Sequence, residues 1–171
     1  MRHTYPSPND RQRGAAAVEF AIVCLLFFTI LFAILEFGRM MYVYNTMQEV
    51  TRRGAREAVV RWVDQGDTIR SLAFFGGAAI PAGAEVTAED MLIEYLNEAG
   101  NVIATTALPL DPGANLSACG NITLVASCIF SVRVSITGVS YSPMVSLFSF
   151  LGINLPPATV TMQAESLGFT I

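Results

Sequence analysis

The sequence contains no lysine, and its only histidine is His3, in a polar segment near the N-terminus. Serine–histidine, cysteine–histidine and Schiff-base mechanisms therefore lack their usual groups, and a zinc site lacks its nitrogen ligands. No glycine-rich phosphate-binding motif is present either. We expect no catalytic, cofactor-binding or metal-binding residues, and we expect that the protein is not an enzyme.

Charged side chains are also scarce. They make up 14% of the 171 residues, against about a quarter in an average soluble domain, whereas 53% of the residues are hydrophobic. The acidic pI of about 4.9 and the lack of a basic stripe in the C-terminal part argue against a nucleic-acid partner. So many apolar residues must be concentrated in one segment if the rest is to fold as a domain.

Proline is absent between Pro8 and Pro81, and the most apolar segment lies in this interval. Residues 15–35 form a run of 21 residues with a single charge, Glu19. As a helix rising about 1.5 Å per residue, the run is roughly 31 Å long, enough to cross a bilayer core. It is longer than the core of a secretory signal, and no small-residue cleavage site follows it. The sequence therefore predicts a membrane anchor in contact with the lipid bilayer.

The flanking arginines bear on the orientation of this anchor. Three precede the run and four follow it within about 20 residues, so the total count does not decide the orientation. The nearest ones, Arg11 and Arg13 before the run and Arg39 after it, favour a cytoplasmic N-terminus. The domain after the run is then expected outside the cytoplasm.

Glu19 lies about one turn into the apolar run, where an isolated ionised carboxylate is costly. The residues alone leave two interpretations open. The carboxylate either lies close enough to the interface to reach headgroups or water, or it meets a positive partner.

The residues around the start of the run form a longer pattern. Residues 11–20 read Arg-Gln-Arg-Gly-Ala-Ala-Ala-Val-Glu-Phe, so that Gly14 is followed by Glu19 at the fifth position and Phe20 at the sixth. Three further stretches follow the run, Glu36-Phe-Gly-Arg39, Tyr42-Val-Tyr-Asn45 and Thr51-Arg-Arg-Gly-Ala-Arg56. Over about 43 residues, this pattern resembles a prepilin peptidase site followed by the TadE-like family of tight-adherence (Flp) pilus proteins.

The resemblance implies processing and assembly roles for four residues. A prepilin peptidase would cleave after Gly14 and create a new N-terminal ammonium at Ala15. Glu19 would then pair with the N-terminal ammonium of a neighbouring subunit, and Phe20 is typical of the tight-adherence class. Cleavage would leave residues 1–14 as a leader peptide.

The resemblance also implies a function and a location. The expected function is that of a pilin-like minor pseudopilin, required to assemble a tight-adherence (Flp type IVb) pilus. Expected partners are the peptidase, other pilin-like subunits and the inner-membrane assembly platform. The protein would be a single-pass protein of the bacterial inner membrane, with its C-terminal domain periplasmic or extracellular. The alternative is an uncleaved single-pass protein whose outer domain is a binding module.

Helical periodicity continues beyond the membrane run. Apolar or small residues recur at three- and four-residue spacing on one side, at Met40, Val43, Met47, Val50 and Gly54. Two Glu-to-Arg pairs at i,i+4 add support, Glu49 with Arg53 and Glu57 with Arg61. We predict one helix from about Ala15 to Trp62.

The remainder of the chain has the shorter patterns of a β-rich domain. We divide it into a linker at 63–90, with a short helix at 68–75 and a loop at 76–85, and a domain at 91–171. Strands are predicted at 91–96, 102–108, 130–137 and 158–165, the first two paired as a hairpin. Residues 144–151 are an apolar stretch, either a short helix or a loop facing the membrane or a partner. The expected fold class is α+β, a long N-terminal transmembrane helix extending into a small antiparallel sheet.

Cys119 and Cys128 are an even pair in a domain expected outside the cytoplasm, which fits a disulfide. If residues 121–137 were one strand, nine residues would place the two backbones about 30 Å apart. A disulfide requires Cα atoms within about 7 Å. The bond therefore requires a turn or bulge near Ala126-Ser127 or a fold-back before Ile122.

Overall fold

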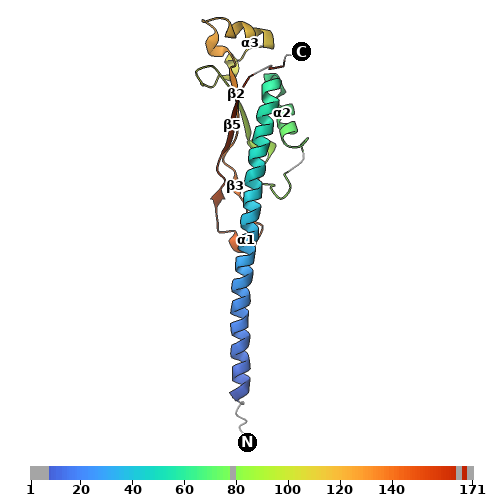
Figure 1. The fold of residues 1–171 in the computed structure, drawn as a ribbon, viewed down its shortest axis with the longest axis vertical. Helices are drawn as coiled ribbons and strands as arrows, with labels where there is room; N and C mark the ends of the chain where they lie inside the picture. The colour runs from blue at the N-terminus through green and yellow to red at the C-terminus, as the bar shows by residue number, and fades with distance from the viewer. Residues whose placement is uncertain (1–7, 78–79, 165–166, 169–171) are drawn as a thin grey trace.

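The computed structural model describes residues 8–77, 80–164 and 167–168, and of residues 8–13 only the backbone. Figure 1 shows a long helix with a small domain packed on its C-terminal half. The helices are α1 (Pro8–Val60), α2 (Gly66–Ala73) and α3 (Pro112–Cys119), and short 3-10 turns occur between elements. The strands are β1 (Met91–Leu96), β2 (Ser131–Ile136), β3 (Ser140–Tyr141), β4 (Ile153–Asn154) and β5 (Ala158–Gln163). The predicted α+β class, a long apolar helix followed by a small antiparallel sheet, is confirmed.

α1 is one continuous helix of 53 residues, about 80 Å long. It begins at Pro8, before the predicted start at Ala15, and it ends at Val60 rather than at Trp62. Proline suits the first helical position, since its missing N–H would have no intrahelical partner there. Gly14 is the only strong helix breaker in the following turns, and its cost of about 1 kcal/mol does not stop the helix.

The C-terminal end of α1 is capped by the end of the chain. The backbone N–H groups of Leu167 and Gly168 donate to the carbonyls of Val59 and Val60, each over 3.0 Å. The last four carbonyls of a helix have no intrahelical partner, so these bonds satisfy two of them. Trp62 has an extended backbone, and its side chain is buried in the core. These two features explain why the helix ends before Trp62.

The C-terminal half of α1 packs its predicted apolar stripe against the domain. Val43, Met47 and Val50 are almost completely buried. An ideal Cβ on Gly54 would lie 3.0 Å from the Met91 side chain, so the sheet approaches the helix backbone closely there. Both predicted ion pairs form along the same helix, Glu49–Arg53 at 3.6 Å and Glu57–Arg61 at 2.9 Å. The predicted helix face is therefore confirmed.

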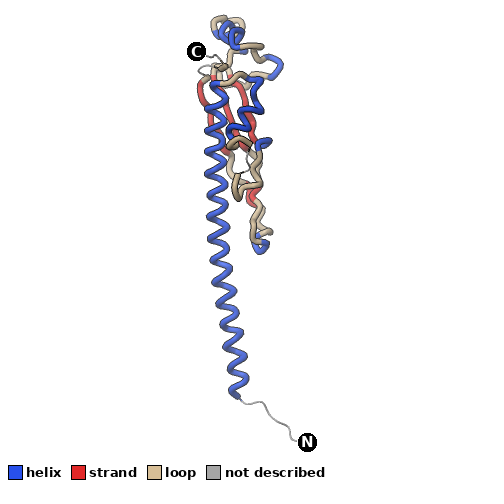
Figure 2. The backbone as a smooth tube through the Cα atoms, turned by 90° about the vertical axis from the view of Figure 1, so that its right-hand side faces the viewer, coloured by secondary structure: helices blue, strands red, loops and turns tan. Residues whose placement is uncertain are grey.

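Three strands form an antiparallel sheet in the order β1–β2–β5. The register of the central strand pairs Val134 with Ile93 on one side and with Val160 on the other. Alternate residues of β2, Val132, Val134 and Ile136, are fully buried. The sheet runs along α1 (Figure 2), and the core lies between the two. β3 and β4 pair separately as a short ribbon.

The predicted hairpin between 91–96 and 102–108 forms only beside its turn, and the predicted strand at 102–108 is wrong. β1 pairs along one edge with β2. On its other edge Leu96 bridges Val102, and two backbone bonds close the turn, from Ile103 N–H to the Tyr95 carbonyl and from Asn97 N–H to the Asn101 carbonyl. After Ile103 a 3-10 turn (Thr105–Ala107) leads the chain away from the sheet. The second pairing of β1 therefore stops after one bridge, and its full ladder is the one with β2.

The remaining boundaries differ by small amounts. α2 occupies 66–73 instead of 68–75, and β2 and β5 are shorter than the predicted strands by one or two residues at their ends. Within the predicted loop 76–85, the described residues contain no helix or strand, and residues 78–79 lie outside the described residues. The apolar stretch 144–151 holds one 3-10 turn, Ser146–Phe148.

α3 was not predicted, although its start carries two ordinary signals. The Asp111 carboxylate accepts a hydrogen bond from the Ala114 N–H at 2.8 Å, and Pro112 lies in the first turn. The helix ends at Cys119, which is joined by a disulfide to Cys128, with Cα atoms 4.8 Å apart. A 3-10 turn just before Cys128 provides the turn that the bond required.

Candidate functional site: the bare helix and its junction with the domain

No part of the chain that the structure describes covers the apolar run of α1. In its 18-residue window of high hydropathy, 2.8 on average, no residue is buried. Large apolar side chains are exposed along this part, such as Phe20 at 70% and Leu35 at 60%. A helix that is apolar all round belongs in a protein core or in lipid. α1 therefore has the length and composition of a single-pass membrane anchor.

The four residues predicted for processing and assembly lie on this bare part. Gly14 has no neighbouring atom within 4 Å of the position that a Cβ would take. Ala15, Glu19 and Phe20 are exposed. Among the side chains that the structure describes, no cation lies within 4.0 Å of the Glu19 carboxylate. The roles of these residues therefore stay predictions.

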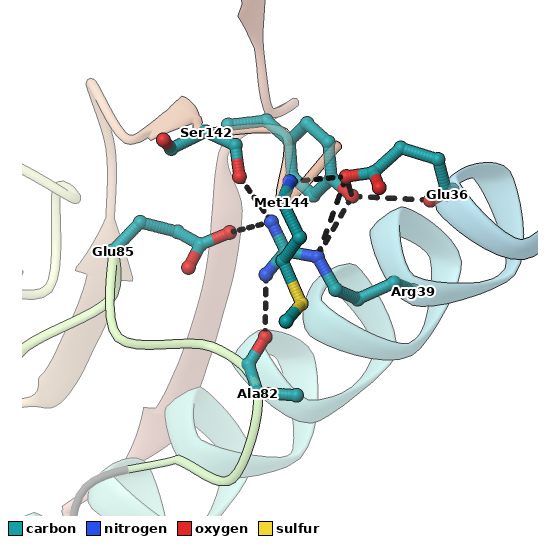
Figure 3. A network of polar contacts seen from close by, with 7 residues as sticks. Glu36, Arg39, Ala82, Glu85, Ser142 and Met144 are labelled. Atoms are coloured by element: carbon teal, nitrogen blue, oxygen red, sulfur yellow. Dashed lines mark hydrogen bonds and ion pairs between the residues drawn. The ribbon is translucent and has the colours of Figure 1, made fainter. Parts of the chain in front are cut away.

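Directly after the apolar run, the helix is tied to the domain by a cluster of charged and polar side chains. This junction cluster consists of Glu36, Arg39, Glu85 and Tyr141. Figure 3 labels the three charged members and shows Arg39 between the two carboxylates. Glu36 and Arg39 lie one turn apart on α1, Glu85 belongs to the loop before β1, and Tyr141 ends β3. The three charged side chains are only 10–12% exposed, so the cluster is largely shielded from water.

Arg39 is the centre of the cluster. Its Nε donates to the Tyr141 hydroxyl at 3.0 Å, its Nη1 donates to the Ala82 carbonyl at 2.6 Å, and its Nη2 donates to the Ser142 carbonyl. Nη2 also lies 3.2 Å from Glu85 Oε1. The guanidinium carbon sits 4.5 Å from the centre of the Tyr141 ring, within the range of a cation–π contact. One side chain thus joins the helix to two loops and a strand.

Glu36 completes the connection on the side nearer the apolar run. Its Oε1 accepts hydrogen bonds from the Tyr141 hydroxyl at 2.6 Å and from the Met144 N–H at 2.9 Å. Burial opposes ionisation of this carboxyl, but these two bonds and the charge of Arg39 outweigh it and lower its pKa. Burial, reinforced by the bond to Glu36, raises the pKa of Tyr141 to about 12. The cluster is therefore built around an ionised Glu36 and a neutral Tyr141.

Comparison with known proteins covers the first part of this arrangement. Residues 14–56 match the TadE-like protein family. No curated protein and no solved structure gives a match to the chain. The TadE-like segment comprises 43 of the 171 residues, about a quarter. The match points to a Tad pilus-related protein, and the TadE-like family is not known as enzymatic.

The TadE-like segment maps onto three successive parts of α1. It begins at Gly14, contains the whole bare apolar run, includes Glu36 and Arg39, and extends over most of the packed stripe. The partners of Glu36 and Arg39, namely Glu85 and Tyr141, lie outside the segment. The junction cluster therefore connects a TadE-like helix to a domain that the family match does not cover.

Sequence reasoning used Glu36 and Arg39 only as part of a family pattern and missed their contact with the domain. The sequence did carry a signal for this contact. Two opposite charges directly after a long apolar run need polar partners if they are shielded from water, so a domain segment was to be expected beside them. Their partners carried no such signal. Glu85 lies in a loop and Tyr141 in a strand of only two residues, where neither period nor spacing indicates a contact with α1.

Proposed function

We propose that this protein is a pilin-like minor pseudopilin of the bacterial inner membrane, required to assemble a tight-adherence pilus. The observation that carries the proposal is the TadE-like match, which starts at Gly14 and runs over a helix whose apolar half is bare. The N-terminus would be cytoplasmic and the domain periplasmic or extracellular. The bare half of α1 is available to lipid before assembly and to neighbouring pilin-like subunits or the assembly platform during it.

The proposal includes cleavage by a prepilin peptidase after Gly14. Three features support this position. The family match begins at this residue, no described atom lies within 4 Å of a Cβ built on Gly14, and glycine weakens a helix by about 1 kcal/mol relative to alanine. Because Gly14 lies inside α1, we expect the peptidase to unwind the first turns of the helix before it reaches the peptide bond.

Glu19 would act after cleavage. The new ammonium at Ala15 of one subunit and the Glu19 carboxylate of its neighbour would form an ion pair near the membrane edge. Such a pair offsets the cost of placing either charge alone among apolar side chains. The exposure of Glu19 on a bare helix is compatible with this role.

The first test measures the N-terminus of the membrane-purified protein by intact mass, with and without a co-expressed prepilin peptidase. We expect a start at Ala15 that depends on the peptidase. Gly14→Leu should block this cleavage, whereas Gly38→Leu should not. Gly38 is a matched control because it also lies in α1 with no atom near its Cβ position.

Two results would contradict the proposal. A start at Met1 or Arg2 in the presence of the peptidase would favour an uncleaved membrane protein whose outer domain binds a partner. Normal piliation with Glu19→Gln in a strain that lacks the wild-type protein would remove the assembly role of Glu19. We expect that variant to be cleaved normally and to assemble poorly.

A further inference from the structure

The loop from Pro143 to Leu151 has an unusual surface for a segment next to a charged cluster. Met144 is 73% exposed and Phe150 is 77% exposed, and Leu147 between them is exposed as well. The sequence from residue 134 to residue 164 contains no charged side chain. Exposed apolar patches of this kind mark contacts with proteins or membranes.

The loop lies at the end of the domain nearest the N-terminus of α1. In Figure 1 it is the orange-red segment beside the α1 label, and Figure 2 shows the same end of the domain beside the helix. The bond from Met144 N–H to Glu36 holds the loop at the level where the apolar run ends. An apolar cavity of 200 Å³ separates the loop from the helix, lined among others by Ala33, Phe37, Phe148 and Leu151.

The position of the loop along α1 can be compared with the bilayer. Ala33 and Phe37 bracket Leu35, the last residue of the apolar run, within about 3 Å along the helix axis. If residues 15–35 cross the hydrocarbon core, the loop lies at the boundary between acyl chains and headgroups. Amphipathic segments at this depth bury their apolar side by about 5–10 Å.

We propose that the Pro143–Leu151 loop is a second membrane contact, whose apolar side chains enter the outer leaflet beside α1. The occupant is lipid because the apolar surface of the loop continues directly into the bare surface of the helix, at Leu35 and Phe37. The charged side chains at this level are turned into the junction cluster, so they do not keep the loop in water. The proposal rests on α1 crossing a membrane and not on peptidase processing.

This second contact gives the domain a defined tilt. A single helix leaves a domain free to lean over the membrane, whereas two contacts at one level restrict it. The junction cluster transmits this restriction, since it links Met144 of the loop to Glu36 of the helix.

The test places a nitroxide spin label at Phe150→Cys in the full chain, with Cys24 replaced by alanine. The protein is reconstituted into vesicles of phosphatidylethanolamine and phosphatidylglycerol, and collisions with oxygen and with a nickel chelate are measured by power saturation. Oxygen concentrates in lipid and the chelate in water. Leu26→Cys in the apolar run is the lipid control, and Ile122→Cys, 89% exposed beside α3, is the water control.

We expect the ratio of oxygen to nickel collisions at position 150 to shift from the value at 122 towards the value at 26. Ser149→Cys, an exposed neighbour, gives a second site if the Phe150 variant folds poorly. A ratio equal to that at 122 would overturn the proposal, because the loop would then be in water. Protection from both reagents would overturn it too, in favour of a protein partner. Neither result depends on cleavage at Gly14, so the test is separate from that of the proposed function.

Discussion

Replacing Arg39 by methionine tests whether the junction cluster holds the domain on the helix. The substitution keeps the length of the side chain and removes its charge and all its donors. It leaves the carboxylates of Glu36 and Glu85 without their cation and takes hydrogen bonds from two carbonyls. Breaking a buried ion pair from one side costs about 3–5 kcal/mol. Because the cluster keeps 10–12% exposure, we expect the low end, about 3 kcal/mol.

The assay is thermal unfolding of the full chain in lipid nanodiscs, followed by the fluorescence of Trp62, the only tryptophan. Trp62 is buried in the core between α1 and the domain, so its emission reports whether the two stay together. A loss of about 3 kcal/mol corresponds to a fall in Tm of roughly 6–12 °C for a chain of this size. Arg56→Met is the matched control, since Arg56 is an exposed arginine of the same helix, and we expect a change within about 0.5 kcal/mol.

A double substitution tests whether the lost stability comes from leaving a carboxylate without its cation. With Glu85 also replaced by methionine, no uncompensated carboxylate remains on that side, and we expect part of the lost stability to return. Glu36 keeps its bonds from Tyr141 and Met144 in this variant. If Arg39→Met unfolds at the same temperature as Arg56→Met, the cluster does not hold the domain and the argument is refuted.

Three further outcomes follow from the geometry. The raised pKa of Tyr141 means that the folded state binds the phenol proton more tightly than the unfolded state does. The contribution of Tyr141 to stability is therefore present below pH 10 and is lost as the pH rises towards 12. The difference in tyrosinate absorbance between the wild type and Tyr141→Phe should show a transition near 12, and a transition near 10 would disprove the burial argument. Gly54→Val should destabilise the fold by about 1–3 kcal/mol because the valine side chain meets the sheet, whereas Gly38→Ala should stabilise it by up to about 1 kcal/mol. Both changes are measured by thermal unfolding, and equal effects would contradict the close approach of the sheet at Gly54. Reduction of the disulfide between Cys119 and Cys128 should lower the free energy of unfolding by about 2–3 kcal/mol for so short a loop. An unchanged Tm, in protein whose two free thiols are verified by mass spectrometry, would contradict this expectation.

The parts of the fold that sequence predicted are those that repeat along a helix or a strand. The stripe through Val43, Met47 and Val50 repeats over several helical turns, so the pattern rarely arises by chance and identifies the buried face. The alternation in β2 is of the same kind, because successive side chains of a strand point to opposite faces. Both predictions depend on local order alone, and both are confirmed.

The parts that sequence did not predict depend on contacts between distant segments. β1 was expected to pair with the next apolar stretch along the chain, where it keeps one bridge, whereas its full ladder is with β2, which begins 35 residues beyond the end of β1. Arg39 meets Ala82 and Tyr141, which are 43 and 102 residues away. The periodicity of a sequence contains no information about contacts over such separations. α3 is different, since Asp111 and Pro112 form a helix start that could have been recognised.

The return of the chain end to α1 has a consequence for the order in which the protein is made. α1 is synthesised first, but the strands that cover its stripe include β5, and the bonds to its final carbonyls come from residues 167–168. About a hundred residues separate Val60 from Gln163, which at about 5–20 residues per second takes some 5–20 seconds to synthesise. During that time the part of α1 that packs against β5 is uncovered. The newly made chain therefore exposes, for seconds, an apolar surface that the finished protein buries, and this is the interval in which a chaperone or a neighbouring subunit has access to it.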